Sequence, residues 1–194
     1  MSLRRFHNFG ALIGVTIALA TTVVCPNQLR AQGTEVTEYL AKAKYLVWFA
    51  QRANWRDTDF TTNSAVVLVI LGGNPFEKEM EFFKSQRIKN RKIEVKVVRS
   101  VEDVPDCHIL FVSASEKRNL AKTLKPFKDR RVLTISDVDG FIQEGGIASV
   151  VLKQTGVLVS KPIPDINKEA AARVGLEFTP ELYAAVKSLQ DKYR

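Results

Sequence analysis

The sequence predicts an α/β fold: a three-layer domain with a mostly parallel central sheet, helices on both faces and an antiparallel hairpin at one edge. Three observations lead to this prediction. The runs at 65–71 and 109–112 are continuously apolar, as in strands covered on both faces. Helical patterns follow these runs in the order strand, helix, strand, which is typical of βαβ units. Later, two short apolar runs are separated by only three residues, which favours an antiparallel pair.

The first half of the chain supplies two predicted βαβ units. Apolar residues at helical spacing predict a first helix over 34–52, with Thr34 as its N-cap and with Lys42 and Lys44 on its solvent side. Gly72 and Gly73 end the first strand. The elements expected next are a helix at 76–84, a strand at 93–98, a helical turn at 101–104, a strand at 109–112, a helix at 113–124 and a strand at 132–135. Ser115 is the expected cap of the helix at 113–124, and Pro126 its stop.

The last third predicts the hairpin and two helices. The strands are expected at 147–152 and 156–160, with Pro162 and Pro164 ending their pairing. Asp165 or Asn167 is expected to cap a short helix that runs to residue 174, with Gly175 at its end. The sequence Thr-Pro-Glu at 179–181 has the cap, proline and acid of a helix start, and this last helix is expected to reach about residue 187 or beyond.

Residues 1–31 have the pattern of a cleaved signal peptide, which leaves 32–194 as one domain. Arg4 and Arg5 precede an uncharged stretch from Phe9 to Val24, and Ala31 offers a small residue before a cut. An uncleaved membrane anchor is the alternative, but a spanning helix needs about 20 apolar residues, and this stretch is shorter. A lipoprotein cut before Cys25 is disfavoured because Val24 stands where a small residue is expected.

Export changes how the charge and the cysteines are interpreted. The formal net charge of the whole chain is +8, and residues 1–31 contain three arginines and no acid, so 32–194 carry +5. This balance argues weakly for an anionic partner or surface and does not indicate nucleic-acid binding. Cys107 is then the one cysteine left. It precedes an apolar strand, so we expect it to be buried and unpaired, the alternative being a bond between two chains.

No arrangement of residues predicts catalysis, a metal site or a cofactor site. His108 adjoins Cys107, but neighbouring residues of a strand point to opposite faces and do not readily share a ligand or a proton. Asp137 and Asp139 resemble a carboxylate pair for acid–base work, yet they are better explained as caps of a turn at Gly140. A binding domain without catalysis is therefore the leading hypothesis.

One candidate binding site is a crevice at the carboxyl ends of the strands, where α/β sheets usually bind ligands. Gly73 and Asn74 lie between a strand and a helix, where backbone N–H groups can hold an anion; a tight turn is the alternative. Ser113 and Asp137 follow two other strands. These four residues are the candidates for a small-ligand site.

A second candidate is a partner-binding surface made of the loop 139–144 and the segment 161–166. The loop presents Phe141 and Ile142, and the segment presents Ile163 and Ile166 among prolines that keep it stiff. Apolar residues at such places either anchor a partner or pack beneath the loop, and both alternatives stay open.

Five motifs, in order, resemble the YfiR-like family of exported bacterial proteins. They are AKAKYLVWFAQRANW, VLVILGGNPF, CHILFVS, VLTISDVDGFIQEGG and INKEAAARVGL, and the likeness extends over about 36–190. CHILFVS and the segment from VLTISD to the paired glycines are the specific ones. The resemblance implies a periplasmic α/β domain without known catalysis.

The resemblance also implies a regulatory role. Family members bind the periplasmic part of an inner-membrane diguanylate cyclase and repress it, which lowers cyclic-di-GMP and biofilm formation, and an outer-membrane lipoprotein can sequester them. Other membrane sensor proteins and a homodimer remain alternative partners. Cys107 matches the family's cysteine before histidine, but the chain after residue 31 has no second cysteine, so a disulfide within that part is excluded.

Overall fold

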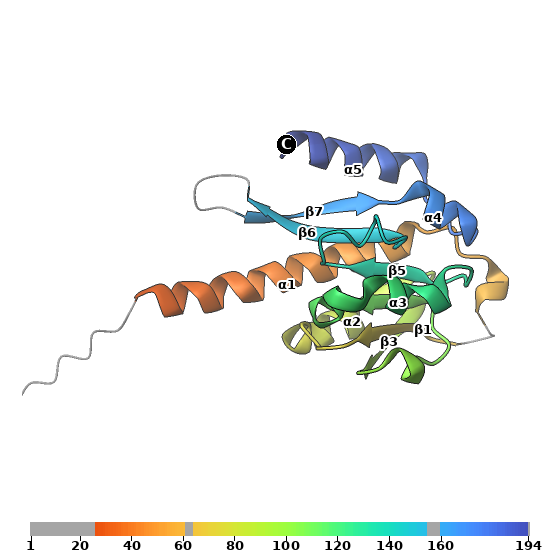
Figure 1. Ribbon diagram of the computed structural model, residues 1–194, viewed down its shortest axis with the longest axis horizontal. Helices are drawn as coiled ribbons and strands as arrows, with labels where there is room; N and C mark the ends of the chain where they lie inside the picture. Colours follow the sequence, from red (N-terminus) through yellow and green to blue (C-terminus); the bar gives the residue numbers. More distant parts are fainter. Residues whose placement is uncertain (1–25, 61–63, 155–159, 194) are drawn as a thin grey trace, which may run out of the picture.

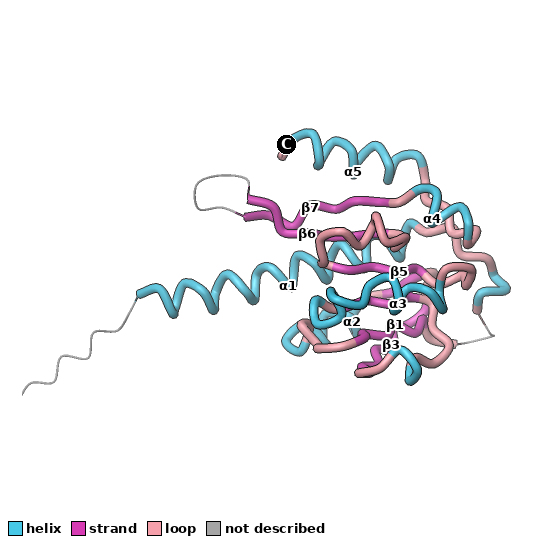
Figure 2. The backbone as a smooth tube through the Cα atoms, viewed as in Figure 1, coloured by secondary structure: helices cyan, strands magenta, loops and turns pink. Residues whose placement is uncertain are grey.

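The computed structural model describes residues 26–60, 64–154 and 160–193, with side chains from residue 38 onward. Residues 1–25 of the predicted signal peptide lie outside the described residues. A seven-stranded sheet in the order β2-β3-β1-β4-β5-β6-β7 forms the centre of the fold (Figures 1 and 2). The strands are β1 (Val66–Leu71), β2 (Arg87–Ile88), β3 (Arg91–Val98), β4 (Ile109–Val112), β5 (Leu133–Ser136), β6 (Ala148–Gln154) and β7 (Ser160–Ile166).

Helices cover both faces of this sheet. The α-helices are α1 (Pro26–Arg52), α2 (Met80–Ser85), α3 (Leu120–Leu124), α4 (Lys168–Arg173) and α5 (Pro180–Lys192). Short 3-10 helices are η1 (Asp57–Asp59), η2 (Glu77–Glu79), η3 (Val101–Asp103), η4 (Ala114–Asn119) and η5 (Lys125–Phe127). One hydrophobic cluster unites α1, α2, α4 and α5 with one face, and another unites α3 and η5 with the opposite face. None of the helices in the described part is long and apolar enough to cross a membrane.

The two clusters explain why the central strands are continuously apolar. In β1, Leu68 and Ile70 pack into the cluster that contains α1, whereas Val69 and Leu71 pack into the cluster that contains α3. Alternate residues of a strand point to opposite faces, so a strand buried on both faces needs apolar residues at every position. The predicted three-layer α/β class is therefore confirmed.

The sheet has an antiparallel pair at each edge, of which the sequence predicted one. β3, β1, β4, β5 and β6 are parallel to one another, β7 pairs antiparallel with β6, and β2 pairs antiparallel with β3. The β2–β3 turn consists of Lys89 and Asn90, with φ of 48° and 63°. Two left-handed residues are what the tightest hairpin turns require. The pair was not predicted because β2 is only two residues long.

β7 departs from the prediction, which had Pro162 and Pro164 end the pairing. Both are paired with β6, opposite Leu152 and Val150, so this prediction is wrong. β7 is an edge strand, where proline is tolerated if its missing N–H would face away from the neighbouring strand. The N–H of Ile166, two residues further on, donates to Asp165 Oδ1 and not to β6, which is consistent with this direction. Of the predicted strand 156–160, residues 156–159 lie outside the described residues.

Helix ends were predicted unevenly. Asn167 and Thr179 cap α4 and α5 by accepting backbone N–H bonds, as expected. The first helix begins at Pro26, so Thr34 lies inside it and is not its cap. The α-helix α3 ends at Leu124, as predicted, and Pro126 lies in the 3-10 turn η5 that follows it. Ser115 does not cap its helix either; the 3-10 helix η4 starts directly after Ser113.

Candidate functional site

The carboxyl ends of β1 and β4 bring three of the four predicted crevice residues close together. A Cβ placed on Gly73 would lie 3.8 Å from Ser113 Oγ, and Asn74 is the next residue along the chain. Gly73, Asn74, Arg99 and Glu116 are among the residues that line an open depression there, which Ser113 does not line. β1 is where the order of the strands reverses, the usual ligand position in such sheets.

Polar groups of the chain itself occupy this crevice. The Gly73 N–H donates to Ser115 Oγ at 3.0 Å. Asn74 Oδ1 accepts the N–H of Phe76 at 3.0 Å, which fixes the local turn. Glu116 adds a carboxylate close to Ser115. The Gly73 N–H that an anion would need is therefore already bonded, and the role of these residues in ligand binding stays a prediction.

Asp137, the fourth crevice residue, lies elsewhere, in a buried ion pair with α1. Its Oδ2 accepts from Lys42 Nζ at 2.9 Å, and both side chains are only 5% exposed. Lys42 also contacts the carboxylate of Glu38 and lies over the ring of Tyr39, 4.6 Å from its centre. Lys42 is thus not on the solvent side of its helix, and Asp137 bonds to this lysine rather than capping the turn at Gly140. Those two predictions are wrong, because ion pairing allows both charges to be buried.

The charges around Lys42 keep it protonated. Burial by itself lowers the pKa of Lys42, but the attraction of Asp137 and the hydrogen bonds to Glu38 and Asp137 outweigh it, so the pKa lies above its ordinary value. The other oxygen of Asp137, Oδ1, is buried and has no hydrogen-bond partner among the described residues. The pair fastens α1 to the end of β5 across 95 residues of sequence.

The predicted partner-binding residues divide into buried and half-exposed ones. Phe141 is fully buried, and its ring lies so close to Gly146 that an added Cβ there would be 2.1 Å from it. Ile163 is 4% exposed, whereas Ile142 and Ile166 are partly exposed. Phe141 and Ile163 therefore pack inside the protein, which is the second of the two alternatives considered for them. Phe141, Ile142 and Ile163 line one small cavity of about 120 Å³; Ile166 does not line it.

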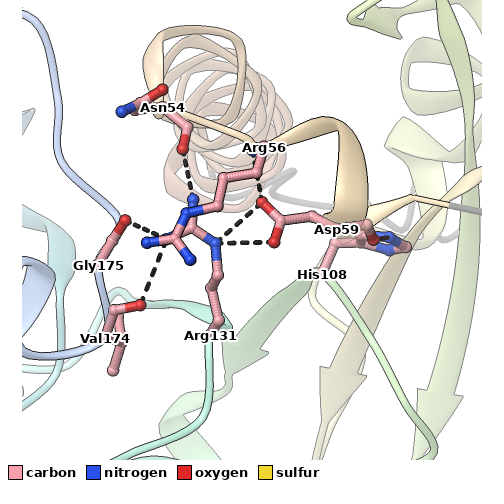
Figure 3. Close-up of polar contacts among 7 residues, drawn as sticks. All are labelled: Asn54, Arg56, Asp59, His108, Arg131, Val174 and Gly175. Carbon is pink, nitrogen blue, oxygen red and sulfur yellow. Dashed lines mark hydrogen bonds and ion pairs between the residues drawn. The ribbon is translucent and has the colours of Figure 1, made fainter.

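At the opposite, amino ends of β4 and β5, a polar network joins three distant segments (Figure 3). Arg131 Nε donates to both carboxylate oxygens of Asp59, at 2.8 and 2.9 Å. Its other nitrogens donate to the carbonyl oxygens of Asn54, Val174 and Gly175. One guanidinium thus ties the connection after α1 to the end of α4 and to the start of β5. Local sequence patterns do not predict this contact because 72 residues separate Asp59 from Arg131.

His108 belongs to the same network. Its Nδ1 accepts the N–H of Val67 at 3.0 Å, so its Nε2 carries the proton and donates to the Asp59 carbonyl oxygen, also at 3.0 Å. The ring stacks on Phe60, with centres 4.9 Å apart. Burial lowers the pKa of His108, although Asp59 partly opposes this. With both nitrogens bonded to the backbone, His108 holds segments together and is not placed to act as a base.

Cys107, next to this network, is free, as predicted, but it is half-buried and not fully buried. Burial raises the pKa of its thiol to about 11, with a small opposing effect of Arg130. Cys107 is therefore a thiol and not a reactive thiolate at neutral pH. Within the described residues, no group of three His, Cys, Asp or Glu side chains is placed to hold a metal ion.

The fold and these contacts define an α/β domain whose buried polar side chains mainly fasten its own segments. A protein-family model described as YfiR/HmsC-like matches residues 39–184, which are 146 of the 194 residues. The chain belongs to this family, as the motifs predicted. The family is regulatory and non-catalytic. Comparison with curated proteins gives no match.

Proposed function

We propose that the chain is exported to the periplasm, where it binds the periplasmic sensor part of an inner-membrane signalling protein and holds it inactive. The partner that the family favours is a diguanylate cyclase. The observation that carries this proposal is the match to a regulatory family over residues 39–184. Such a repressor acts by binding the inactive conformation of its partner more tightly than the active one, which shifts the population toward the inactive form.

The contacts at the sheet ends support a binding role over catalysis. Both nitrogens of His108 are bonded to backbone groups, and the carboxylate of Asp59 is bonded to Arg131. Asp137 forms an ion pair with Lys42. These titratable side chains are thus engaged in holding the fold together.

For the partner surface we propose the loop 139–144 together with the segment 161–166. Ile142 and Ile166 are the partly exposed apolar residues there. Ile142 shares a cavity with the buried Phe141 and Ile163, whereas Ile166 packs against the cluster that contains α1. An apolar anchor at a protein interface typically contributes about 2 kcal/mol or more to binding.

The test combines capture with a cellular readout. The tagged chain, expressed with its own leader, is purified from the periplasm, its mass is measured, and it is used to capture proteins from detergent-solubilised inner membranes. We expect the mass of a chain that begins near residue 32. We also expect the captured proteins to be enriched in a cyclase or another membrane sensor. Binding is then measured with the purified periplasmic domain of that protein.

Deletion of the gene gives the second readout. If the partner is a cyclase, deletion raises cyclic-di-GMP, and re-expression restores the low level. Enrichment of an outer-membrane lipoprotein alone, or recovery of a homodimer alone, would contradict the proposed partner. So would an unchanged cyclic-di-GMP level together with no binding to any purified sensor domain.

A further inference from the structure

A basic surface lies over η4, α3 and η5, and it borders the loop 139–144 of the proposed partner surface. Two depressions of about 400 and 390 Å³ adjoin there and share Ala121 and Glu144. We call them together the basic groove, because basic side chains line them. These are Lys117, Arg118, Lys122, Lys125, Lys128 and Arg173.

The cations of the basic groove far outnumber its carboxylates. Asp139 and Glu144 are the acidic side chains that line it, against six basic ones. Residues 117–128 contain five Lys or Arg and no Asp or Glu, which equals the whole net charge of 32–194. Glu116 and Asp129 flank this stretch. The lining of the groove, with six basic and two acidic side chains, has a formal charge of 6 − 2 = +4, which produces a local positive potential.

The six cations are exposed, and none of them forms a salt bridge with another described side chain. Their neighbours Arg130 and Arg131 both form one, with Asp106 and Asp59. Arg173 Nε donates to the Lys128 carbonyl oxygen at 3.1 Å, and Lys122 attracts the carboxylate of Glu102. Like charges that lack a salt bridge repel one another and stabilise the fold little. Their gathering around a depression therefore indicates an anionic ligand that comes from outside the chain.

The floor of the basic groove is apolar. Leu124, Phe127 and Ile147 line the larger depression and are almost fully buried. A concave apolar floor beneath a rim of cations complements an apolar side chain that is flanked by carboxylates. A flat anionic membrane would reach only the rim.

We infer that the basic groove binds an extended acidic segment of a partner protein. One apolar side chain of that segment lies over Leu124, Phe127 and Ile147, and its carboxylates face Lys125 and Lys128. This inference rests on the proposed function in taking the partner to be the membrane signalling protein. Binding by complementary charge raises the association rate and weakens with salt.

The test uses the full mature protein and a defined probe. A fluorescein-labelled decapeptide of alternating Glu and Leu is titrated with the protein, and fluorescence anisotropy is measured. The groove variant is Lys125→Glu/Lys128→Glu. The control is Lys92→Glu/Lys187→Glu, which makes the same charge change at exposed lysines outside the groove. Neither pair of side chains makes a described hydrogen bond or ion pair, so melting temperatures should stay unchanged.

We expect the peptide to bind the wild type at low salt and to bind the groove variant about tenfold more weakly, because two exposed attractions become repulsions. The control should lose about twofold or less. Equal weakening by both variants, or no binding of the peptide to the wild type, would overturn the inference. So would sedimentation of the wild type, but not of the groove variant, with phosphatidylglycerol vesicles in the absence of peptide binding.

The purified sensor domain separates this inference from the proposed function. If that domain binds wild type and groove variant equally, the proposed function stands and the inference fails. If no sensor domain binds while the peptide binds in a groove-dependent way, the groove still binds acidic segments and the proposed partner fails.

Discussion

Two arginine- and lysine-rich regions of this chain use their charges in opposite ways. In the network around Arg131, one guanidinium is largely buried and bonds to a carboxylate and three carbonyl groups. In the basic groove, six exposed cations have no salt bridge within the described part of the chain. Lys128 and Arg131 are only three residues apart, so composition does not separate the two regions. Ion pairing and burial separate the two regions. They indicate that the first region holds the fold together and that the second is available to a partner.

The largest expected effect is on the network. Arg131→Met should lower the free energy of unfolding by about 3 kcal/mol or more, because it leaves the largely buried Asp59 carboxylate without its cation. Arg130→Met is the matched control: Arg130 pairs with Asp106 on the surface, and the loss should be about 1 kcal/mol or less. Urea denaturation of both variants gives the comparison. Equal losses would show that burial does not distinguish the two arginines.

A similar loss is expected at Phe141, beneath the proposed partner surface. Phe141→Ala should lower the free energy of unfolding by about 3–5 kcal/mol, since the fully buried ring leaves a cavity. Ile142→Ala, one residue further on, should change stability far less and should weaken capture of the partner. Melting temperature and capture are measured for both. A stable Phe141→Ala protein that no longer binds the partner would instead identify Phe141 as an anchor.

A smaller effect concerns pH. Because burial lowers the pKa of His108 in the folded protein, the unfolded chain takes up a proton more readily. The contribution of the neutral His108 to stability is therefore fully present above its pKa in the unfolded chain, about 6.5. This contribution is lost as the pH falls below that value toward the lower pKa of the folded protein. His7 belongs to the predicted leader, so in the mature protein His108→Gln should flatten the dependence of the melting temperature between pH 5 and 7. An unchanged slope in this variant would contradict the assignment.

The smallest expected effect is kinetic. Since burial raises the pKa of Cys107 to about 11, a thiol reagent at pH 7.5 should label the native protein slowly and the unfolded protein quickly. Labelling is followed by absorbance, with and without denaturant. Rapid native labelling, or a disulfide-linked dimer on a non-reducing gel, would contradict a shielded, unpaired thiol.

The sequence predicted what depends on local patterns and failed where distant side chains meet. Continuous apolar runs located β1, β4 and β5, and the capping residues Asn167 and Thr179 located α4 and α5. Helical spacing predicts Lys42 on the solvent side because it cannot show that Asp137, 95 residues away, neutralises the lysine. The Arg131 network was missed for the same reason.

The partner surface shows the same limit. Apolar residues in a loop can point inward or outward, and periodicity does not decide which. The sequence therefore leaves both alternatives open for Phe141 and Ile163, which lie in the core. The basic groove was missed as well. Lys117 and Lys125 belong to two different 3-10 helices, η4 and η5, and Arg173 belongs to α4. Only the folded chain gathers them around one depression.

The central claim is that unpaired cations, and not the buried network, bind the partner. Its most direct test is the equilibrium binding of the purified periplasmic sensor domain to Lys125→Glu/Lys128→Glu and to Lys92→Glu/Lys187→Glu, at the same low salt concentration. We predict that the groove variant binds about tenfold more weakly than the wild type and that the control binds within about twofold of it. Equal affinities of the two variants for the sensor domain would contradict the claim.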